Sequence, residues 1–334
     1  MLMRCMALML LAAAAGACAP SRDGEILWEF QIKKSHVQWG AVDAGRLYLC
    51  ADDVYCLDIA TGSLVWEFKT FGTHASAPVA DAGRLYFQCG GLYALDAATG
   101  RVLWEFWTNE WAADAPAAGA GKVYAQAGGV LYCLDAANGK RLWSLKTGAL
   151  ESAPVVHAGR VFFCHDRAVF CLDAESGQEL WHCEIGSGRG QLACSRGYLV
   201  SAGRGGLVRA HRITTGEVQW QLATDFPLVH FSVTGDGSVL ISAGALYCVN
   251  PETGNPLWTF NPGRLFVRDA YALEGQILAR TFGNEFLLLG GADGSLHRTV
   301  PGSGGSKLVR YGSGAVYFPG GKRRTVTCIS MPAR

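Results

Sequence analysis

A glycine followed four residues later by tryptophan recurs along nearly the whole chain. Successive glycines of this motif lie 38, 38, 39, 38, 39, 38 and 40 residues apart. The pairs are Gly24 and Trp28, Gly62 and Trp66, Gly100 and Trp104, Gly139 and Trp143, Gly177 and Trp181, Gly216 and Trp220, Gly254 and Trp258, with Gly294 and Arg298 as a degenerate eighth copy. A fixed period near 40 residues with strand-like sequence is typical of a β-propeller, in which each repeat forms one blade.

Each repeat contains four strand-like segments separated by turn residues. In the second repeat we expect strands over 75–80, 84–88, 92–95 and 102–106. Gly100 accepts the positive φ that the third turn needs, and the Asp96 carboxylate can accept hydrogen bonds from backbone N–H groups of that turn. The turn aspartates that stand eight residues before a tryptophan are Asp58, Asp96, Asp135 and Asp173.

The repeats count to eight blades. Complete units span about 35–68, 73–106, 111–145, 150–183, 189–222, 228–260 and 265–300, residues 307–330 supply three further strands, and 24–30 supplies an isolated fourth. Joining the two ends in one sheet leaves no long open edge. The sequence therefore predicts an all-β fold, a single eight-bladed β-propeller over 24–330 with four-stranded antiparallel blades, closed by an N-terminal outer strand.

The N-terminus has the pattern of an export signal. Arg4 is followed by an apolar stretch from Cys5 to Ala15 that is too short to span a bilayer. Small residues directly before Cys18 resemble a bacterial lipobox, so we expect a signal peptide over 1–17, lipidation of Cys18 and a tether over 18–23. Ala15-x-Ala17 also fits ordinary cleavage and soluble export. With no Asp at position 19, a lipidated protein is expected at the periplasmic face of the outer membrane of a Gram-negative cell.

Charge and cysteine content exclude some functions. Charged residues are only 17% and the formal net charge is +1, so we expect no nucleic-acid partner. Cysteine recurs at one third-strand position, where the second repeat has Ala94, which indicates a small, packed site rather than a metal ligand. These cysteines are Cys56, Cys133, Cys171, Cys248 and Cys328. Disulfides between Cys50 and Cys56, or between Cys164 and Cys171, are an alternative in an oxidising compartment.

The pattern Asp96-x-x-Thr99-Gly100-x-x-x-Trp104, preceded by Leu92-Tyr93-x-Leu95, resembles the repeat of the pyrroloquinoline-quinone-like (PQQ-like, quinoprotein alcohol dehydrogenase-like) β-propellers. The resemblance implies that the tryptophans dock between neighbouring blades. Large members are dehydrogenases that carry PQQ and calcium. Smaller members include the cofactor-free propeller lipoprotein of the outer-membrane β-barrel assembly machinery. The short chain, minimal loops and missing pair of adjacent cysteines favour the second group.

We therefore expect a non-enzymatic exported scaffold that contacts a protein partner through its loops, without cofactor, metal or catalytic residues. The alternatives are a PQQ-dependent dehydrogenase or quinone sensor, and a module that binds carbohydrate or another small ligand at the propeller funnel. Polar residues near the starts of inner strands are candidates for that funnel, against the favoured alternative that each is an ordinary surface residue. They are His36, His74, Glu151, Arg189, His230 and Arg268.

Loop aromatics and irregular repeats mark a possible binding surface. The aromatics are Phe71, Trp107, Trp111, Phe226 and Phe266, whose alternative role is to pack loops against the ring. The repeat departs from its pattern where Arg212, Asn250 and Gly290 replace the turn aspartate and Arg298 replaces the tryptophan. Blades five and seven are therefore the places where we expect binding or looser packing, unless the changes are neutral drift.

Overall fold

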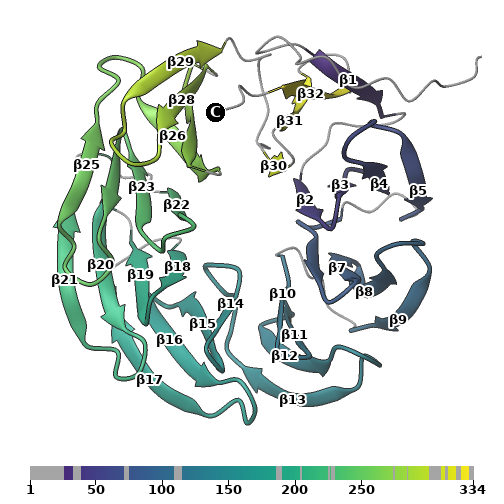
Figure 1. The fold of residues 1–334 in the computed structure, drawn as a ribbon. Coiled ribbons are helices and arrows are strands. Elements are labelled where there is room, and N and C mark those ends of the chain that lie inside the picture. The colour runs from purple at the N-terminus through teal and green to yellow at the C-terminus, as the bar shows by residue number, and fades with distance from the viewer. Residues whose placement is uncertain are drawn as a thin grey trace, which may run out of the picture.

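The computed structural model describes residues 26–32, 39–70, 75–108, 115–185, 190–203, 205–224, 226, 230–273, 275–283, 285–300, 310–312, 315–320 and 325–330. Within these ranges the protein is built from strands and turns, arranged as eight sheets around a central channel (Figure 1). The predicted signal peptide, tether and Cys18 lie outside the described residues. Nowhere in the described part does a helix occur that is long and apolar enough to cross a membrane.

Every sheet contains four antiparallel strands, which confirms the predicted blades. From the channel outward, blades 1 to 4 contain β2 (Trp39–Asp43), β3 (Arg46–Cys50), β4 (Val54–Asp58) and β5 (Leu64–Phe68); β6 (Val79–Asp81), β7 (Arg84–Cys89), β8 (Gly91–Asp96) and β9 (Val102–Phe106); β10 (Ala117–Gly119), β11 (Lys122–Ala127), β12 (Val130–Asp135) and β13 (Arg141–Lys146); β14 (Val155–His157), β15 (Arg160–His165), β16 (Ala168–Asp173) and β17 (Glu179–Glu184).

Blades 5 to 8 follow the same order. They contain β18 (Gln191–Ser195), β19 (Tyr198–Ala202), β20 (Leu207–Arg212) and β21 (Val218–Ala223); β22 (His230–Val233), β23 (Val239–Ala243), β24 (Ala245–Val249) and β25 (Pro256–Phe260); β26 (Val267–Ala272), β27 (Gln276–Thr281), β28 (Phe286–Gly290) and β29 (Leu296–Val300); β30 (Arg310–Gly312), β31 (Ala315–Gly320), β32 (Thr325–Ser330) and β1 (Ile26–Gln31).

The ring closes through the two ends of the chain. The N-terminal strand β1 pairs antiparallel with β32, with Trp28 opposite Cys328 and Phe30 opposite Val326. In Figure 1 the purple β1 lies beside the yellow β31 and β32. The predicted closure by an N-terminal outer strand is confirmed, and the outer strand of blade 8 comes from the opposite end of the chain to its other three.

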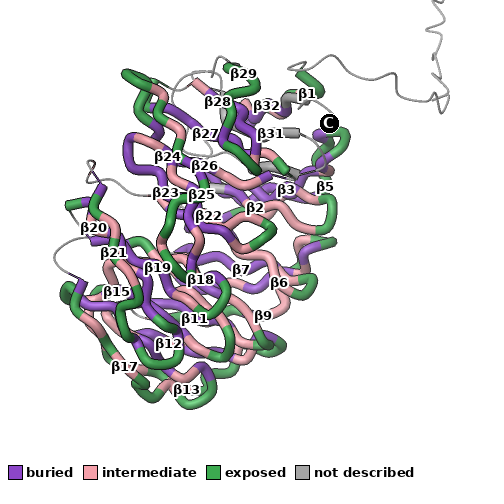
Figure 2. Tube along the Cα trace, turned by 60° about the vertical axis from the view of Figure 1, so that its left-hand side comes forward, coloured by how far each residue is buried: buried purple, intermediate pink, exposed green. Residues whose placement is uncertain are grey.

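The hydrophobic core lies between the blades rather than at a single centre. One cluster joins blades 8 and 1 through Leu47, Leu57 and Val326, and another joins blades 1 and 2 through Trp66, Leu85 and Phe87. In Figure 2 the buried residues follow the inner strands of the blades, and the exposed residues lie in the turns and along the outer strands. Each blade therefore depends on its neighbours to bury its apolar surface.

The innermost strand of blade 2 is shorter than predicted. We expected a strand over 75–80, but β6 covers only Val79–Asp81. Pro78 has no N–H to donate to a ladder, and Ser76 bonds instead with Gln88. The Ser76 N–H donates to the Gln88 carbonyl at 2.8 Å, and the Gln88 N–H donates to the Ser76 hydroxyl at 3.0 Å.

The third turn of blade 2 is held by Asp96. Its Oδ1 accepts hydrogen bonds from the Thr99 hydroxyl at 2.7 Å and from the Thr99 N–H at 2.9 Å, while Gly100 has a φ of 72°. The Gly100 N–H donates to the Asp96 carbonyl at 2.8 Å. The same backbone bond joins Gly216 to Arg212 and Gly294 to Gly290. Irregular repeats therefore change the side chains of the turn but not its backbone.

Acid is expected to loosen these turns. The Thr99 hydroxyl lowers the pKa of Asp96 from its ordinary 3.8, and similar bonds lower those of Asp58 and Asp173. A carboxyl whose pKa is lower in the folded state stabilises the fold above its unfolded pKa, and this stability is lost as the pH falls through the folded pKa. The melting temperature of the wild type should therefore decline steeply below about pH 4.

Blade 6 shows that asparagine can replace the turn aspartate. In its equivalent turn, Asn250 Oδ1 accepts hydrogen bonds from the Glu252 and Thr253 N–H groups. The variant Asp96→Asn should keep the turn while removing its titration, so its melting temperature should fall less steeply with acid. Parallel pH curves for variant and wild type would contradict this assignment.

Candidate functional site

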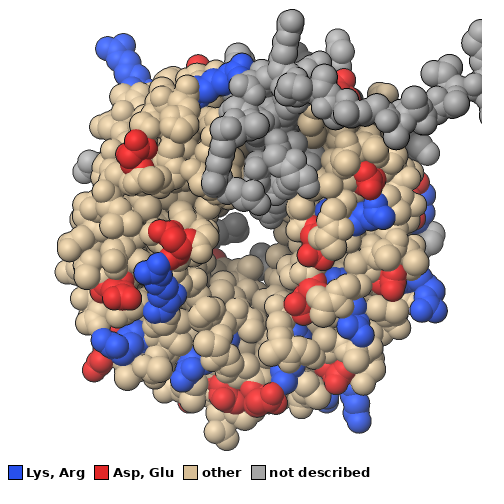
Figure 3. Space-filling view, viewed as in Figure 1, with Lys and Arg blue, Asp and Glu red and all other residues tan. Residues whose placement is uncertain are grey.

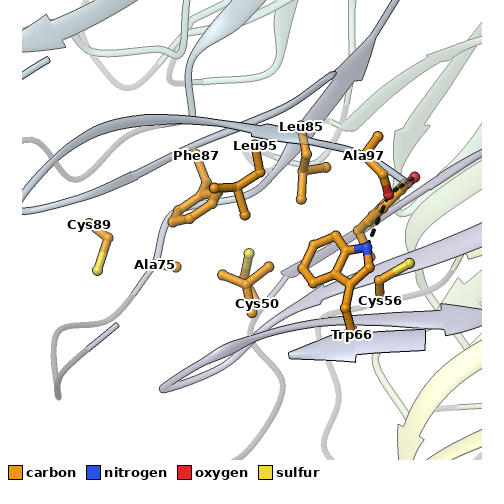
Figure 4. Packing of buried hydrophobic residues seen from close by; sticks show 11 residues of the cluster. Cys50, Cys56, Trp66, Ala75, Leu85, Phe87, Cys89, Leu95 and Ala97 are labelled. Atoms are coloured by element: carbon orange, nitrogen blue, oxygen red, sulfur yellow. Dashed lines mark hydrogen bonds between the residues drawn. The ribbon is translucent and has the colours of Figure 1, made fainter. Parts of the chain in front are cut away.

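Tryptophan docking joins each blade to the next. At the joint between blades 1 and 2, the Trp66 Nε1 donates to the Ala97 carbonyl at 3.1 Å (Figure 4). The Trp66 ring covers Gly100, where an added Cβ would lie 2.6 Å from the ring. Gly100 therefore has two roles. It adopts the positive φ of the turn, and its missing side chain leaves room for the tryptophan of the preceding blade.

Seven joints repeat this contact. The Nε1 to carbonyl distances lie between 2.8 and 3.2 Å and join Trp28 to Ile59, Trp66 to Ala97, Trp104 to Ala136, Trp143 to Ala174, Trp181 to Ile213, Trp220 to Pro251 and Trp258 to Gly291. At the eighth joint Arg298 stands in place of tryptophan and is exposed. The glycine expected opposite it, Gly24, lies outside the described residues.

A β-bulge that the sequence did not reveal positions these tryptophans. In blade 2, Ala94 pairs with Trp104 but the next residue, Leu95, pairs with Val102, so Leu103 is the extra residue. The same shift occurs between the third and fourth strands of blades 1 to 7. The bulge places Trp104 on the side that faces the next blade.

The repeated cysteines lie in separate joints. Cys56, Cys133, Cys171, Cys248 and Cys328 belong to five different hydrophobic clusters. No disulfide joins any of the ten cysteines of the described ranges, which include the four of the alternative disulfides. Burial raises the pKa of Cys133 and of Cys248 to about 11. The described residues also contain no group of three His, Cys, Asp or Glu placed to hold a metal ion.

The structure describes three of the six funnel candidates. His36, His74 and Arg189 lie outside the described residues, whereas Glu151 precedes β14 of blade 4, His230 begins β22 of blade 6 and Arg268 lies in β26 of blade 7. The His230 ring lies 5.2 Å from the Tyr271 ring, and the Glu151 N–H donates to the Cys164 carbonyl at 2.7 Å. Figure 3 shows an opening through the ring, with charges of both signs interspersed on that face. A shared funnel site stays a prediction.

A buried ion pair in blade 7 is a second feature that the sequence did not reveal. The Arg280 Nε donates to Asp269 Oδ1 at 3.0 Å, and a second guanidinium N–H donates to Asp269 Oδ2. Arg280 is 2% exposed and Asp269 is 6% exposed. Ala279 packs against blade 6, so strand alternation directs Arg280 to the opposite side, toward blade 8. The seventh blade therefore replaces part of its apolar interface with a charged pair.

Three phenylalanines, of which Phe266 and Phe282 are exposed and Phe226 is half-buried, form a patch on one face of blades 6 and 7. The Phe226 ring centre lies 4.9 Å from that of Phe266 and 6.1 Å from that of Phe282. Phe266 is 44% exposed, Phe282 is 42% exposed, and the neighbouring Leu265 is 40% exposed. The Arg268 guanidinium lies 5.9 Å from the Phe282 ring centre. We call these five residues the loop-face patch.

Sequence reasoning found only part of this patch. Phe226 and Phe266 lie in the connections between blades, so the sequence identified them as loop aromatics. Phe282 directly follows β27, and its sequence position is typical of the end of a buried strand. Trp107 is more exposed, at 58%, but stands apart, with its Nε1 bonded to Glu105 at 2.8 Å. Phe71 and Trp111 lie outside the described residues.

The fold and its joints define a class, the eight-bladed propellers whose PQQ-like repeats are locked by tryptophan. The family model described as outer membrane protein assembly factor BamB matches residues 15–222 and 204–322. The chain belongs to this family. No protein with a curated description matches it.

Solved structures share the architecture at low sequence identity. BamB from Moraxella catarrhalis superposes with a TM-score of 0.74 and 17% identity, covering 92% of this chain and 100% of that one. The computationally designed Ika8 protein gives 0.77 and 17%, with 92% and 100% covered. Quinohemoprotein alcohol dehydrogenase from Comamonas testosteroni gives 0.72 and 14%, with 93% and 77% covered. These likenesses establish the fold alone.

Proposed function

We propose that this protein is an exported, non-enzymatic scaffold that holds another protein of the outer-membrane assembly machinery against its loop-face patch. The observation that carries the proposal is the patch itself, in which the exposed rings of Phe266 and Phe282 adjoin the half-buried Phe226 in a member of the BamB family. The proposal includes no catalytic residue, metal or PQQ. The funnel alternative stays a prediction, since three of its six candidates lie outside the described residues.

The chemistry of the patch favours a protein partner. Aromatic residues and arginine are enriched at protein interfaces and dominate their binding energy. Arg268 places a cation at the edge of the phenylalanines, and Arg264 stands exposed in the same connection. A complementary partner segment carries an apolar side chain beside a carboxylate. Association would bury the rings of Phe266 and Phe282, which water now contacts.

The lipid anchor is part of the same proposal. Removal of residues 1–17 would leave Cys18 as a lipidated N-terminus, and 18–23 would tether the propeller to the periplasmic face of the outer membrane. Radioactive palmitate should label the wild type and a Cys183→Ala variant but not a Cys18→Ala variant. Label retained after loss of Cys18, or an unlabelled wild type, would contradict the anchor.

Substitutions in the patch test the scaffold. Phe266→Ser together with Phe282→Ser should leave the protein folded and lower the melting temperature by only a few °C, because each residue is already more than 40% exposed. Recovery of assembly-machinery proteins with the tagged protein from detergent-solubilised envelopes should fall about thirtyfold, as expected for the loss of an aromatic hot spot. Quantitative mass spectrometry of the recovered proteins measures this change.

Leu142 provides a matched control. It is 46% exposed on the outer strand β13, far along the chain from the patch, and Leu142→Ser should change neither stability nor recovery. Equal recovery of assembly proteins by the wild type and the double phenylalanine variant would reject the patch as the docking surface.

A further inference from the structure

A cavity of about 720 Å³ opens at the joint between blades 6 and 7. Its walls come from the turn between β22 and β23, the turn between β26 and β27, and the turn after β28. These turns lie on the opposite side of the ring from the connections that carry the loop-face patch. The lining residues on which the inference depends are Trp258, Cys248, Gly291, Asp236, Ser238 and Gln276. The volume is typical of a small-molecule site.

Three other joints fill the corresponding position with tyrosine. Tyr48, Tyr86 and Tyr124 stand two residues into the second strands of blades 1 to 3 and are almost fully buried. Their hydroxyls donate to the carbonyls of Ala97, Ala136 and Ala174 at 3.0 to 3.5 Å. The docked tryptophans donate to these same carbonyls, so each carbonyl accepts one indole N–H and one phenol O–H.

Blade 4 keeps the ring but not the hydroxyl. Phe162 occupies the position, and its ring centre lies 6.0 Å from that of Trp181. Blade 5 has Val200 there, but at that joint Arg196 reaches across and donates to the Asp236 carbonyl. An aromatic ring therefore fills this position at the joints from blade 1 to blade 5, and at the next joint the Arg196 side chain bridges the two blades.

In blade 6 the position holds Leu240, which like Val200 has neither the ring nor the hydroxyl, and it pairs with Cys248 of the cavity wall. The Gly291 carbonyl accepts the Trp258 Nε1 at 3.1 Å, and no hydroxyl of the described residues occupies its second lone pair. The long cations Arg46, Arg84, Lys122 and Arg160, which begin the second strands of blades 1 to 4, are replaced by Ser238 in blade 6 and Gln276 in blade 7. Both of these shorter side chains belong to residues that line the cavity.

We propose that this cavity binds a phenol, with its ring beside Trp258 and its hydroxyl donating to the Gly291 carbonyl. The phenol is either a free small molecule or the side chain of a tyrosine on a partner protein. The site is separate from the loop-face patch, and the inference does not depend on the proposed scaffold function. It rests on the position that tyrosine fills in three sister joints and that Leu240 leaves open.

Asp236 adds a charge preference. Its carboxylate lines the cavity and accepts hydrogen bonds from Thr234 and Ser238, which lower its pKa from the ordinary value. An ionised carboxylate at the wall repels anionic ligands and attracts cations. The site therefore selects neutral or cationic phenols, such as p-cresol or tyramine, over 4-hydroxyphenylacetate.

Titration of the full-length protein with paired probes tests the site. By isothermal titration calorimetry, p-cresol should bind about fivefold more tightly than toluene, the size of one net hydrogen bond. Tyramine should bind more tightly than 4-hydroxyphenylacetate. Equal affinity for p-cresol and toluene, or no binding of p-cresol at about 10 mM, would overturn the proposal. Comparable binding of N-acetyltyrosinamide would indicate a protein tyrosine as the source, and its exclusion would indicate a free phenol.

A variant that restores the tyrosine of the sister joints tests whether the cavity binds phenols. Leu240→Tyr should place a hydroxyl on the Gly291 carbonyl, abolish p-cresol binding and raise the melting temperature. Leu142→Tyr, on an exposed outer strand, should change neither. If Leu240→Tyr does not fold, Gln276→Arg narrows the mouth from outside the core and should weaken p-cresol binding at least threefold. A folded Leu240→Tyr protein that binds p-cresol like the wild type would disprove the site.

Discussion

Trp104→Ala is expected to lower the free energy of unfolding by about 3–5 kcal/mol. Trp104 is only 8% exposed, and its indole fills the space above Gly139 at the joint between blades 2 and 3. The variant loses this burial and leaves the Ala136 carbonyl without the Trp104 Nε1, which now donates to it at 3.0 Å. Denaturant unfolding followed by fluorescence and circular dichroism measures the loss.

Two further variants show whether the lost stability comes from tryptophan docking or from the loss of any aromatic ring. Trp107→Ala removes an exposed tryptophan and should cost less than about 1 kcal/mol. Gly139→Ala should cost several kcal/mol although it adds only one methyl group, because the new Cβ would lie 2.6 Å from the Trp104 ring at a positive φ. Equal costs for Trp104→Ala and Trp107→Ala would contradict the docking account.

Arg280→Met should also cost about 3 kcal/mol, because it leaves the buried Asp269 carboxylate with only the exposed Arg268 guanidinium, 4.0 Å away, as a partner. Arg280→Met combined with Asp269→Leu should recover most of the loss, since apolar residues of similar volume often replace a buried ion pair without penalty. Thermal and denaturant unfolding of the two single variants and the double variant form the complete cycle.

An exposed ion pair provides the control for this cycle. Arg46 and Asp58 form an ion pair at 2.8 Å, with both side chains 34% exposed. Arg46→Met should cost less than about 1 kcal/mol, because water already solvates both charges. If Arg280→Met cost no more than Arg46→Met, the Asp269 carboxylate would not be as isolated from water as its 6% exposure indicates.

The blade count and the ring closure could be predicted from sequence because their signals are local. Gly100 and Asp96 make a turn within five residues, and Trp104 follows at a fixed distance. The bulge at Leu103 could not be predicted, since it depends on how two strands pair rather than on one segment. The short β6 follows from Pro78 and from the bonds of Ser76 to a neighbouring strand.

The features that suggest function depend on contacts between distant parts of the chain. Phe226 and Phe282 lie in different blades, and only the folded ring brings their rings together. Leu240 is an ordinary core residue in its own strand. Only a comparison with Tyr48 and Tyr86, which hold the same position in other joints, shows that a phenol is absent there. Sequence alone located irregularity in blades 5 and 7, whereas the structure places the cavity between blades 6 and 7 and the patch across them.

Site-specific photo-crosslinking in living cells tests the central claim, that the loop-face patch contacts a protein of the outer-membrane assembly machinery. A photoreactive phenylalanine analogue would replace Phe282, Phe266 or, as a control, Leu142. The account predicts a covalent adduct with the same assembly protein from positions 282 and 266 and none from position 142. Adducts from position 142 alone, or no adduct from either patch position while the protein is exported and folded, would contradict it.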